Sequence, residues 1–228
     1  MIGIIGAMEI EVESIKALLT EKKVKNISGT EFVSGRYEGR EVVVAKCGVG
    51  KVFAALCTEA MILEYKPEMI INIGVAGCLA ENLKIGDIVI ADKVVQHDMD
   101  TSALGDPAGM ISDINMIYLP ADARICAALK ESVEDTGIGC EIGTIASGDQ
   151  FVSDGEIKNR IVQKFGAKSC EMEGGAIGHV CYVNNVPFGV LRAMSDGADD
   201  GAKLDFPAFA KKAAENSTKV IKKFLTII

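Results

Sequence analysis

Short runs of hydrophobic residues alternate along the chain with longer stretches in which hydrophobic residues recur at helical spacing. The short runs are rich in Val and Ile and predict β-strands, whereas the longer stretches predict helices. Strands are expected at 2–5, 31–33, 41–46, 69–73, 88–95, 143–147 and 188–195, with one more ending near Glu171. Helices are expected at 9–19, 51–65, 121–135, 154–165 and 174–184, and the last helix is expected to start at Pro207.

This alternation of strands and helices predicts the fold class. We expect an α/β fold of three layers, in which helices cover both faces of a central, twisted, mixed and largely parallel sheet. The run 69–73 is almost continuously apolar, as in a strand that is covered on both faces. A turn at Gly39 joins two neighbouring strands, so the sheet is not purely parallel. Because no repeat or Pro/Gly/Ser-rich linker divides the sequence, we expect a single domain over residues 1–228.

The charge balance narrows the range of partners. The chain has 24 Lys and Arg against 32 Asp and Glu, a net charge of −8. Nucleic-acid binding requires a basic face, so we expect no nucleic-acid partner. The longest apolar run, 69–80, is interrupted by Asn72 and is far shorter than the roughly 20 residues of a membrane span. The start of the chain also lacks the basic residues of a signal peptide. We therefore expect a cytoplasmic protein that has no membrane partner.

The cysteines give no indication of a metal site. The chain has 7 Cys, which form no C-x-x-C pair and have no His at metal-ligand spacing. An odd and scattered set in a chain of this size is typical of reduced thiols in a reducing compartment. We expect neither a metal ion nor disulfides.

Polar or small residues gather at the predicted carboxyl ends of four strands, where α/β folds bind their ligands. The four segments are 3–11, 72–78, 171–173 and 192–196. The first three also have a purely structural interpretation, since acidic residues favour a helix N-terminus and small residues suit a tight turn. The glycine spacing near the N-terminus lacks the G-x-G-x-x-G of dinucleotide-binding folds, which disfavours a Rossmann-type oxidoreductase.

Asp196 is the polar residue that a structural role explains least well. It follows the apolar strand 188–195, and a Gly-rich segment comes after it instead of a helix. Partial burial at such a position raises the pKa of a carboxyl group, as a general acid requires. Glu171 and Glu173 are separated by one residue and would project to the same side of an extended backbone.

Taken together and in order, these segments resemble the 5′-methylthioadenosine/S-adenosylhomocysteine nucleosidases of the purine nucleoside phosphorylase superfamily. The resemblance covers essentially the whole chain and rests on 3–11, 48–52, 72–77, 86–89, 97–98, 147–151, 171–173 and 192–196. It implies a nucleoside phosphorylase-like sandwich that acts as a homodimer without a metal or organic cofactor. It also implies hydrolysis of the adenine N-glycosidic bond in 5′-methylthioadenosine, S-adenosylhomocysteine and 5′-deoxyadenosine, as in methionine salvage and removal of the methyl-cycle product.

The resemblance implies the catalytic residues. Asp196 would protonate adenine N7, and Ser195 would orient its carboxyl group. Glu11 would activate the attacking water, with Arg192 near that water. Glu173 would hold the ribose hydroxyls. Departure of adenine and positive charge on the ribose would both be eased by this arrangement, because a proton donor faces the base and carboxylates face the sugar.

The resemblance also implies the residues that bind the rest of the substrate. Phe151 would stack on adenine, and the backbone of Val152 would read its edge. The backbone of Met172 would lie beside the ribose, which Met8 and Phe206 would enclose. Three residues that follow the strand 69–73 would complete the substrate-binding set: Val75, Ala76 and Gly77.

Two features depart from the family pattern. Val75 stands where many members have Ser, and Cys78 follows Gly77 where Gly is common, so a hydroxyl that helps to hold the water is absent. The segment 99–110, which in relatives caps the substrate tail across the dimer, matches poorly. We still expect a partner loop near Leu104 to close the pocket, and the preferred substrate stays open among the three nucleosides above and aminodeoxyfutalosine.

Two alternatives share the expected fold. A phosphorylase would need Arg side chains around a phosphate, notably after the strand 69–73, where this chain has Asn72 and no Arg. A nucleoside-binding protein without activity would have no reason to combine Glu11 with Asp196. The two carboxyl groups therefore favour a hydrolase.

Overall fold

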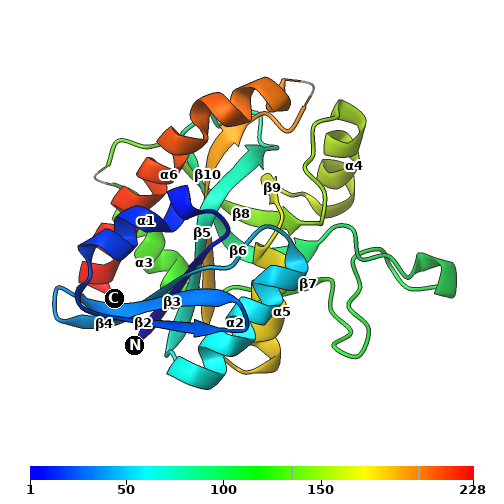
Figure 1. Ribbon diagram of the computed structural model, residues 1–228. Helices are drawn as coiled ribbons and strands as arrows, with labels where there is room; N and C mark the ends of the chain where they lie inside the picture. The colour runs from blue at the N-terminus through cyan, green and yellow to red at the C-terminus, as the bar shows by residue number, and fades with distance from the viewer. Residues whose placement is uncertain (135, 200) are drawn as a thin grey trace.

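The computed structural model describes residues 1–134, 136–199 and 201–228, and its strands form one mixed sheet (Figure 1). The strands are β1 (Ile2–Gly6), β2 (Thr20–Ile27), β3 (Thr30–Tyr37), β4 (Arg40–Lys46), β5 (Met69–Cys78), β6 (Ile88–Gln96), β7 (Tyr118–Pro120), β8 (Cys140–Ser147), β9 (Ser169–Glu171) and β10 (Phe188–Asp196). Their order is β10, β6, β8, β9, β5, β1, β4, β3 and β2, with β7 paired to β6. The expected mixed sheet is confirmed, with parallel pairings at its centre and antiparallel pairings at the β2 edge.

Part of the sheet closes on itself, which the sequence did not indicate. β5 pairs in parallel with both β1 and β10, and β10 pairs on its other side with β6. β6 continues through β8 to β9, and β9 returns to β5. The strands β5, β10, β6, β8 and β9 therefore form a ring, while β1, β4, β3 and β2 extend from it as an open sheet.

Helices cover both faces of the sheet, as expected (Figure 1). The helices are α1 (Glu9–Leu18), α2 (Lys51–Tyr65), α3 (Ala123–Glu134), α4 (Gly155–Phe165), α5 (Gly174–Val183), α6 (Ala202–Ile227) and the short 3₁₀ helix η1 (Ser102–Leu104). On one face α1, α3 and α6 pack into a core with Ile4, Val44 and Leu191, and on the other face α2 and α5 pack against Ile5 and Val190. Complete burial of one such side chain contributes about 1.5–3 kcal/mol.

Two predicted element boundaries are wrong, the end of β5 and the start of α6, and both lie near the pocket described below. β5 does not end at Ile73 but continues to Cys78, because its small residues pair with β10: Gly74 lies opposite Arg192, and Ala76 opposite Met194. The last helix starts at Ala202 rather than at Pro207, which lies inside α6. A turn starts the helix early, since the N–H of Ala202 donates to the carbonyl of Asp199.

Other differences follow from weak sequence signals. The pattern did not predict β2, which is exposed along nearly its whole length and so has no buried face to produce alternation. It also missed the three-residue strand β7. The helix expected at 121–135 starts two residues later, where the Asp122 carboxylate caps the N–H groups of Arg124 and Ile125. Its expected last residue, Asp135, lies outside the described residues.

All seven cysteines are free thiols. Within the described residues, no helix is both long and apolar enough to cross a membrane.

Candidate active site

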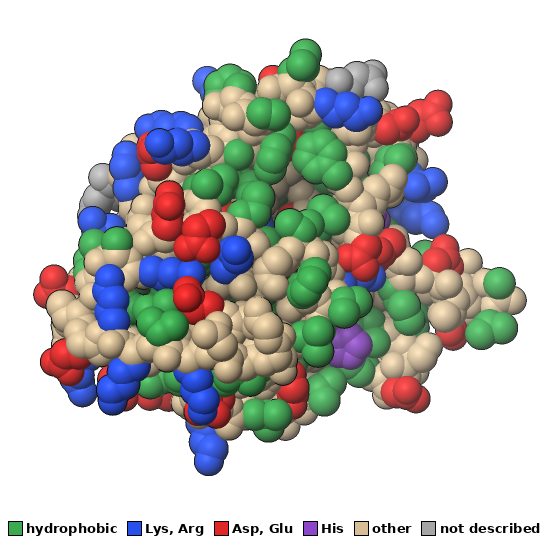
Figure 2. Space-filling view, viewed as in Figure 1, with side chains coloured by type: hydrophobic (Ala, Val, Ile, Leu, Met, Phe, Trp, Pro, Cys, Tyr) green, Lys and Arg blue, Asp and Glu red, His purple; other side chains and the backbone are tan. Residues whose placement is uncertain are grey.

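A pocket opens where the carboxyl ends of β1, β5 and β10 meet the end of β9 and the first turns of α1 and α6. It encloses about 630 Å³ when the open space at its mouth is included. Figure 2 shows it as a hollow that hydrophobic side chains surround. The closed and open parts of the sheet meet at β5, so the pocket lies over their junction.

The pocket brings together all thirteen residues that the sequence analysis assigned to catalysis or substrate binding. Five more residues line it and had no assigned role: Ala7, Val49, Gln150, Cys170 and Glu171. For Glu171 a signal existed, because it forms a pair of carboxylates with Glu173. Ala7, Val49 and Gln150 lie in segments that carry the family resemblance, but like Cys170 they have no charged side chain that would single them out.

Glu11 lies in the first turn of α1 and is 1% exposed. Its Oε2 atom accepts hydrogen bonds from the backbone N–H groups of Ala7 (2.7 Å) and Met8 (2.8 Å). Its Oε1 atom accepts a third from the N–H of Val75 on β5 (3.0 Å). Burial raises the pKa of Glu11, and Arg192 together with these N–H groups offsets only part of the rise. The carboxylate is thus held in one orientation and is more basic than an exposed glutamate.

Arg192 supplies a positive charge from β10 beneath the pocket and is 1% exposed. Its Nη2 atom forms an ion pair with Glu171 and lies 3.4 Å from Oε2 of Glu173. The same nitrogen donates to Oδ1 of Asn72 (2.6 Å). Burial lowers the pKa of Arg192, but the surrounding carboxylates outweigh burial and hold that pKa above its usual value. The guanidinium therefore stays charged, and the protein engages it through Nη1 and Nη2, whereas its buried Nε atom has no hydrogen-bond partner among the described residues.

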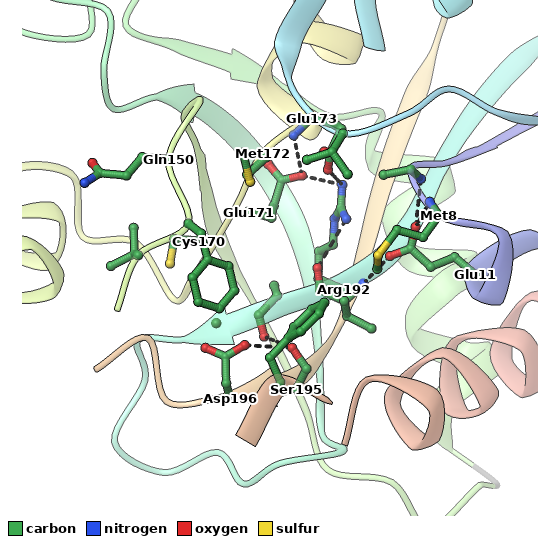
Figure 3. Close-up of a pocket in the computed structure, with 18 residues that line it drawn as sticks. Met8, Glu11, Gln150, Cys170, Glu171, Met172, Glu173, Arg192, Ser195 and Asp196 are labelled. Atoms are coloured by element: carbon green, nitrogen blue, oxygen red, sulfur yellow. Dashed lines mark hydrogen bonds and ion pairs between the residues drawn. The ribbon is translucent and has the colours of Figure 1, made fainter. Parts of the chain in front are cut away.

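Glu171 is committed to the protein on both oxygens. Its Oε2 atom accepts the backbone N–H groups of Glu173 (3.0 Å) and Gly174 (2.8 Å), and its Oε1 atom accepts the hydroxyl of Ser147. Together with Arg192 it forms the rigid floor of this side of the pocket (Figure 3).

Glu173 is bound less completely. Its Oε1 atom accepts the backbone N–H of Gly50 (2.9 Å). Burial and the charges of Glu171 and Glu11 raise the pKa of Glu173 to about 7, although Arg192 and the Gly50 N–H act in the opposite direction. Of the two glutamates on β9 and its end, Glu173 is the one available to a ligand.

Asp196 lies across the pocket from Glu11 and Glu173 (Figure 3). Its Oδ2 atom accepts the hydroxyl of Ser195 (2.8 Å), and its Oδ1 atom accepts the backbone N–H of Ala198 (2.9 Å). Burial raises the pKa of Asp196 against both hydrogen bonds. The expected contact between Ser195 and Asp196 is therefore present in the structure.

Aromatic rings close the space between these groups. Phe151 and Phe206 meet edge to face, with ring centroids 5.6 Å apart and an interplanar angle of 79°. Phe151 is 43% exposed at the mouth, whereas Val152 next to it is 5% exposed. An exposed ring at the mouth of a pocket offers a planar ligand a surface for stacking.

The arrangement suits acid–base chemistry on a small molecule. Asp196, whose pKa is raised, lies on one side of a largely apolar pocket, which three glutamates (Glu11, Glu171 and Glu173) and Arg192 also line. Within the described residues, no group of three or more His, Cys, Asp or Glu is placed to hold a metal ion.

Comparison with known proteins agrees with this geometry. A sequence model of the phosphorylase superfamily matches residues 1–226. A 5′-methylthioadenosine/S-adenosylhomocysteine nucleosidase of Shewanella loihica is 40% identical over 222 residues, which cover 96% of each chain. The crystal structure of the Neisseria meningitidis nucleosidase of the same name, in complex with methylthio-immucillin-A, superposes with a TM-score of 0.97 at 34% identity, covering 100% of this chain and 99% of that one.

A second solved structure has a different name. The futalosine hydrolase of Helicobacter pylori superposes with a TM-score of 0.95 at 37% identity, covering 100% of this chain and 97% of that one. These matches extend over nearly the whole chain, and they agree with one another in fold. The chain belongs to the phosphorylase superfamily and, within it, to the 5′-methylthioadenosine/S-adenosylhomocysteine nucleosidases, a family of N-glycosidic hydrolases.

Proposed function

We propose that this protein hydrolyses the N-glycosidic bond of 5′-methylthioadenosine and S-adenosylhomocysteine, and of 5′-deoxyadenosine, releasing adenine and the 5-substituted ribose. The observation that carries the proposal is the pair formed by Asp196 and Glu11, two buried carboxyl groups with raised pKa on opposite sides of one pocket. These products assign the protein to methionine salvage and to removal of the methyl-transfer product.

Asp196 acts as the general acid. Adenine is a poor leaving group as an anion, so protonation at N7 lowers the barrier to its departure. The raised pKa of Asp196 supports a protonated carboxyl group, and the Ser195 hydroxyl holds that group in place. Phe151 stacks on the adenine ring, and the Val152 backbone contacts its edge. Ala76 and Gly77, on the strand opposite Asp196, leave room for the base.

Glu11 acts as the general base toward water. Three backbone N–H groups fix its carboxylate, and its raised pKa makes it a better proton acceptor. An acid and a base on opposite sides of the scissile bond follow the logic of inverting glycosidases. The Val75 side chain has no hydroxyl, and its backbone N–H and carbonyl already bond Glu11 and Arg192, so the water depends on Glu11 and on the nearby Arg192.

Glu173 stabilises the ribose. Breaking the bond builds positive charge on the sugar, and an ionised carboxylate at the hydroxyl groups stabilises that charge. The Oε1 atom of Glu173 is held by Gly50, which orients the group toward the pocket that it lines. The Met172 backbone, Met8 and Phe206 enclose the ribose.

We further propose that two copies of the chain form a homodimer in which a loop near Leu104 of each copy covers the other copy's pocket. The segment between β6 and β7 extends away from the body of the molecule (Figure 1). Leu104, in the 3₁₀ helix η1 of this segment, is 85% exposed. Val52 and Leu56 on α2 are 69% and 52% exposed, and a protein partner would cover this apolar surface.

The phosphate dependence of the reaction tests hydrolysis against phosphorolysis. Among the described residues that line the pocket, Arg192 alone carries a positive charge, and carboxylates and Asn72 already engage it. Binding of a phosphate dianion requires free Arg or Lys groups, and the glutamates of the pocket would repel it. We expect adenine release in phosphate-free buffer, no acceleration by added phosphate, and 5-methylthioribose as the second product. Formation of 5-methylthioribose-1-phosphate in proportion to phosphate would overturn the proposal.

Steady-state rates with the four candidate nucleosides would establish the preferred substrate. The solved futalosine hydrolase structure with the same fold makes aminodeoxyfutalosine the most informative competitor of 5′-methylthioadenosine. A kcat/KM for aminodeoxyfutalosine that exceeds the other three would reassign the substrate and leave the reaction type unchanged.

A further inference from the structure

The N-terminus of α2 is directed at Glu173. Gly50 precedes the helix with φ of 99°, in the left-handed region that favours glycine. In this conformation its backbone N–H points at Oε1 of Glu173, 2.9 Å away. A Cβ atom at Gly50 would lie 3.0 Å from Oδ1 of Asp149, so a neighbouring loop packs closely on the same turn.

Three residues hold this turn in place by closing a ring of contacts. The backbone N–H of Lys51 donates to Oδ1 of Asp149 (2.7 Å), and the Lys51 Nζ atom donates to Oδ1 of Asp98 (2.7 Å). The backbone N–H of Asp149 donates in turn to Oδ2 of Asp98 (2.8 Å). We call Lys51, Asp98 and Asp149 the α2 clasp. It joins the start of α2 to the ends of β6 and β8.

The α2 clasp is partly buried and charged. The Lys51 and Asp98 side chains are 19% and 29% exposed, so their ion pair is less screened than one on the open surface. Burial raises the pKa of Asp98, but hydrogen bonds from Lys51 and Asp149 outweigh burial and hold that pKa below its usual value. Lys51 also donates to Oε1 of Gln96 (3.2 Å). None of the three clasp residues is among those that line the pocket.

We propose that the α2 clasp positions Glu173 for the reaction by fixing the Gly50 N–H against its carboxylate. Lys51 and Asp98 are therefore positioning residues that act through Gly50, and their effect on catalysis rests on the role proposed above for Glu173.

The pH dependence of the reaction gives this proposal a specific signature. The groups that face Glu173 are Arg192, Glu171, Glu11, Cys47 and the Gly50 N–H. The Gly50 N–H favours the ionised form of Glu173, and its loss would raise the pKa of Glu173 further. Because the ionised form stabilises the ribose cation, activity would then be lost at a higher pH as the medium is acidified.

Lys51→Met removes the ammonium group of the clasp and tests the proposal. We expect kcat/KM for 5′-methylthioadenosine to fall about tenfold, which is the effect of one hydrogen bond to a charged group. The acid limb of its pH profile should move to higher pH. The inhibition constant of adenine should stay unchanged, because adenine has no ribose for Glu173 to hold. Asp98→Asn should behave in the same way, and the double variant should be no worse than either single one.

A matched control is available at the other end of α2. Lys25 on β2 forms an ion pair with Glu64 near the end of α2, with 2.5 Å between Nζ and Oε1. This pair is remote from Glu173, so Lys25→Met should leave kcat/KM and the pH profile unchanged. The inference would be overturned if both Lys51→Met and Asp98→Asn had the kcat/KM of the wild type and the same acid limb in the pH profile. A parallel weakening of adenine binding would also overturn it, since that result indicates general distortion of the pocket. Glu173→Gln separates the two proposals: if it is active, the role of Glu173 is wrong, whereas an inactive Glu173→Gln beside normal clasp variants rejects the clasp alone.

Discussion

At the scale of single residues, the pocket separates carboxyl groups by what surrounds them. Glu171 is tied by Arg192, Ser147 and two N–H groups, whereas Glu173 has one oxygen held by Gly50. Asp196 is hydrogen-bonded only by Ser195 and Ala198 among its described contacts. Identical functional groups therefore differ in their freedom to meet a ligand, and different surroundings are what divide acid and base roles in one site.

Asp196→Asn and Glu11→Gln should each lower kcat about 10²–10⁴-fold, the usual contribution of a positioned acid or base. Asp196→Asn preserves shape and should change the melting temperature little. Glu11→Gln also preserves shape but sets an amide NH2 against at least one of the backbone N–H groups that Glu11 accepts, so it should lower the melting temperature as well as the rate. Glu13→Gln is the control for Glu11, because Glu13 lies exposed on the same helix and should leave the rate unchanged. Retention of more than about a tenth of the wild-type rate in either active-site variant would contradict that residue's role.

Glu171→Gln should affect both stability and pH dependence. Loss of one partner of a buried ion pair costs about 3–5 kcal/mol, measurable as a drop in the free energy of unfolding in denaturant. The charge of Glu171 raises the pKa of Glu173, which is about 7, so its removal lowers that pKa. The acid limb of kcat/KM should move to lower pH in the folded variant, opposite to the shift expected for Lys51→Met. An unmoved limb would show that Glu173 does not control it.

The sequence could identify residues with distinctive chemistry more readily than their partners. Asp196 stood out because a polar residue ends an apolar strand, whereas Glu11 was assigned through the family resemblance, since an acidic residue at a helix start also has a structural interpretation. The role of Glu171 depends on Arg192, which reaches it from another strand, and no local pattern reports such a contact. The catalytic roles themselves stay predictions until the variants are measured.

At the scale of secondary-structure elements, β5 has two roles: it is a strand of the sheet, and its last residues form part of the pocket wall. Its small residues were expected to form a loop, yet they pair with β10 while Arg192 and Glu11 pass over them. The sequence predicted the order of most strands and helices, because buried strands carry continuous apolar runs. It missed β2, whose exposed and Lys-rich residues carry no such run, and it placed the start of α6 late.

Gly74→Ala should disturb the site through this strand. A Cβ atom at Gly74 would overlap Nη1 of Arg192 and Oε1 of Glu11, both of which are buried and cannot move freely. We expect a loss of about 1–3 kcal/mol in the free energy of unfolding and a clear fall in kcat. Gly155→Ala is the control, since no atom lies within 4 Å of a Cβ atom there. Normal kcat in Gly74→Ala would mean that Glu11 tolerates displacement.

At the scale of the whole molecule, the ring of β5, β10, β6, β8 and β9 depends on pairings between strands that lie far apart in the sequence. β10 comes last of these strands in the sequence, yet it pairs with β5 on one side and with β6 on the other. Local patterns can predict that these strands exist, but they do not encode which strands become neighbours. The layered sandwich was therefore predictable, and the closure was not.

The proposed dimer can be tested by mixing two variants that are each impaired in a different part of the shared site. Leu104→Asp should weaken binding of 5′-methylthioadenosine by the partner's pocket, because an exposed apolar side chain is replaced by a charge. Glu11→Gln disables its own pocket. Once unfolded, mixed and refolded together, the two variants should regain activity, since one pocket of each mixed dimer has an intact Glu11 and an intact covering loop. Light scattering that shows a monomer at micromolar concentration, or mixing without recovery, would contradict the shared site.

The closed ring also affects which parts of the site can open by local fluctuations. β5 pairs with β1 on one side and β10 on the other, and β10 pairs with β6 on its far side over Leu191–Ala193, so the amide groups in these doubly paired stretches should reach solvent only when the ring breaks. The aromatic mouth around Phe151 and the segment that carries Leu104 have no such restraint and can open locally at low cost. We therefore expect ligand entry and product release to require movement of the rim, while the charged groups beside β5 and β10 keep their spacing from one turnover to the next.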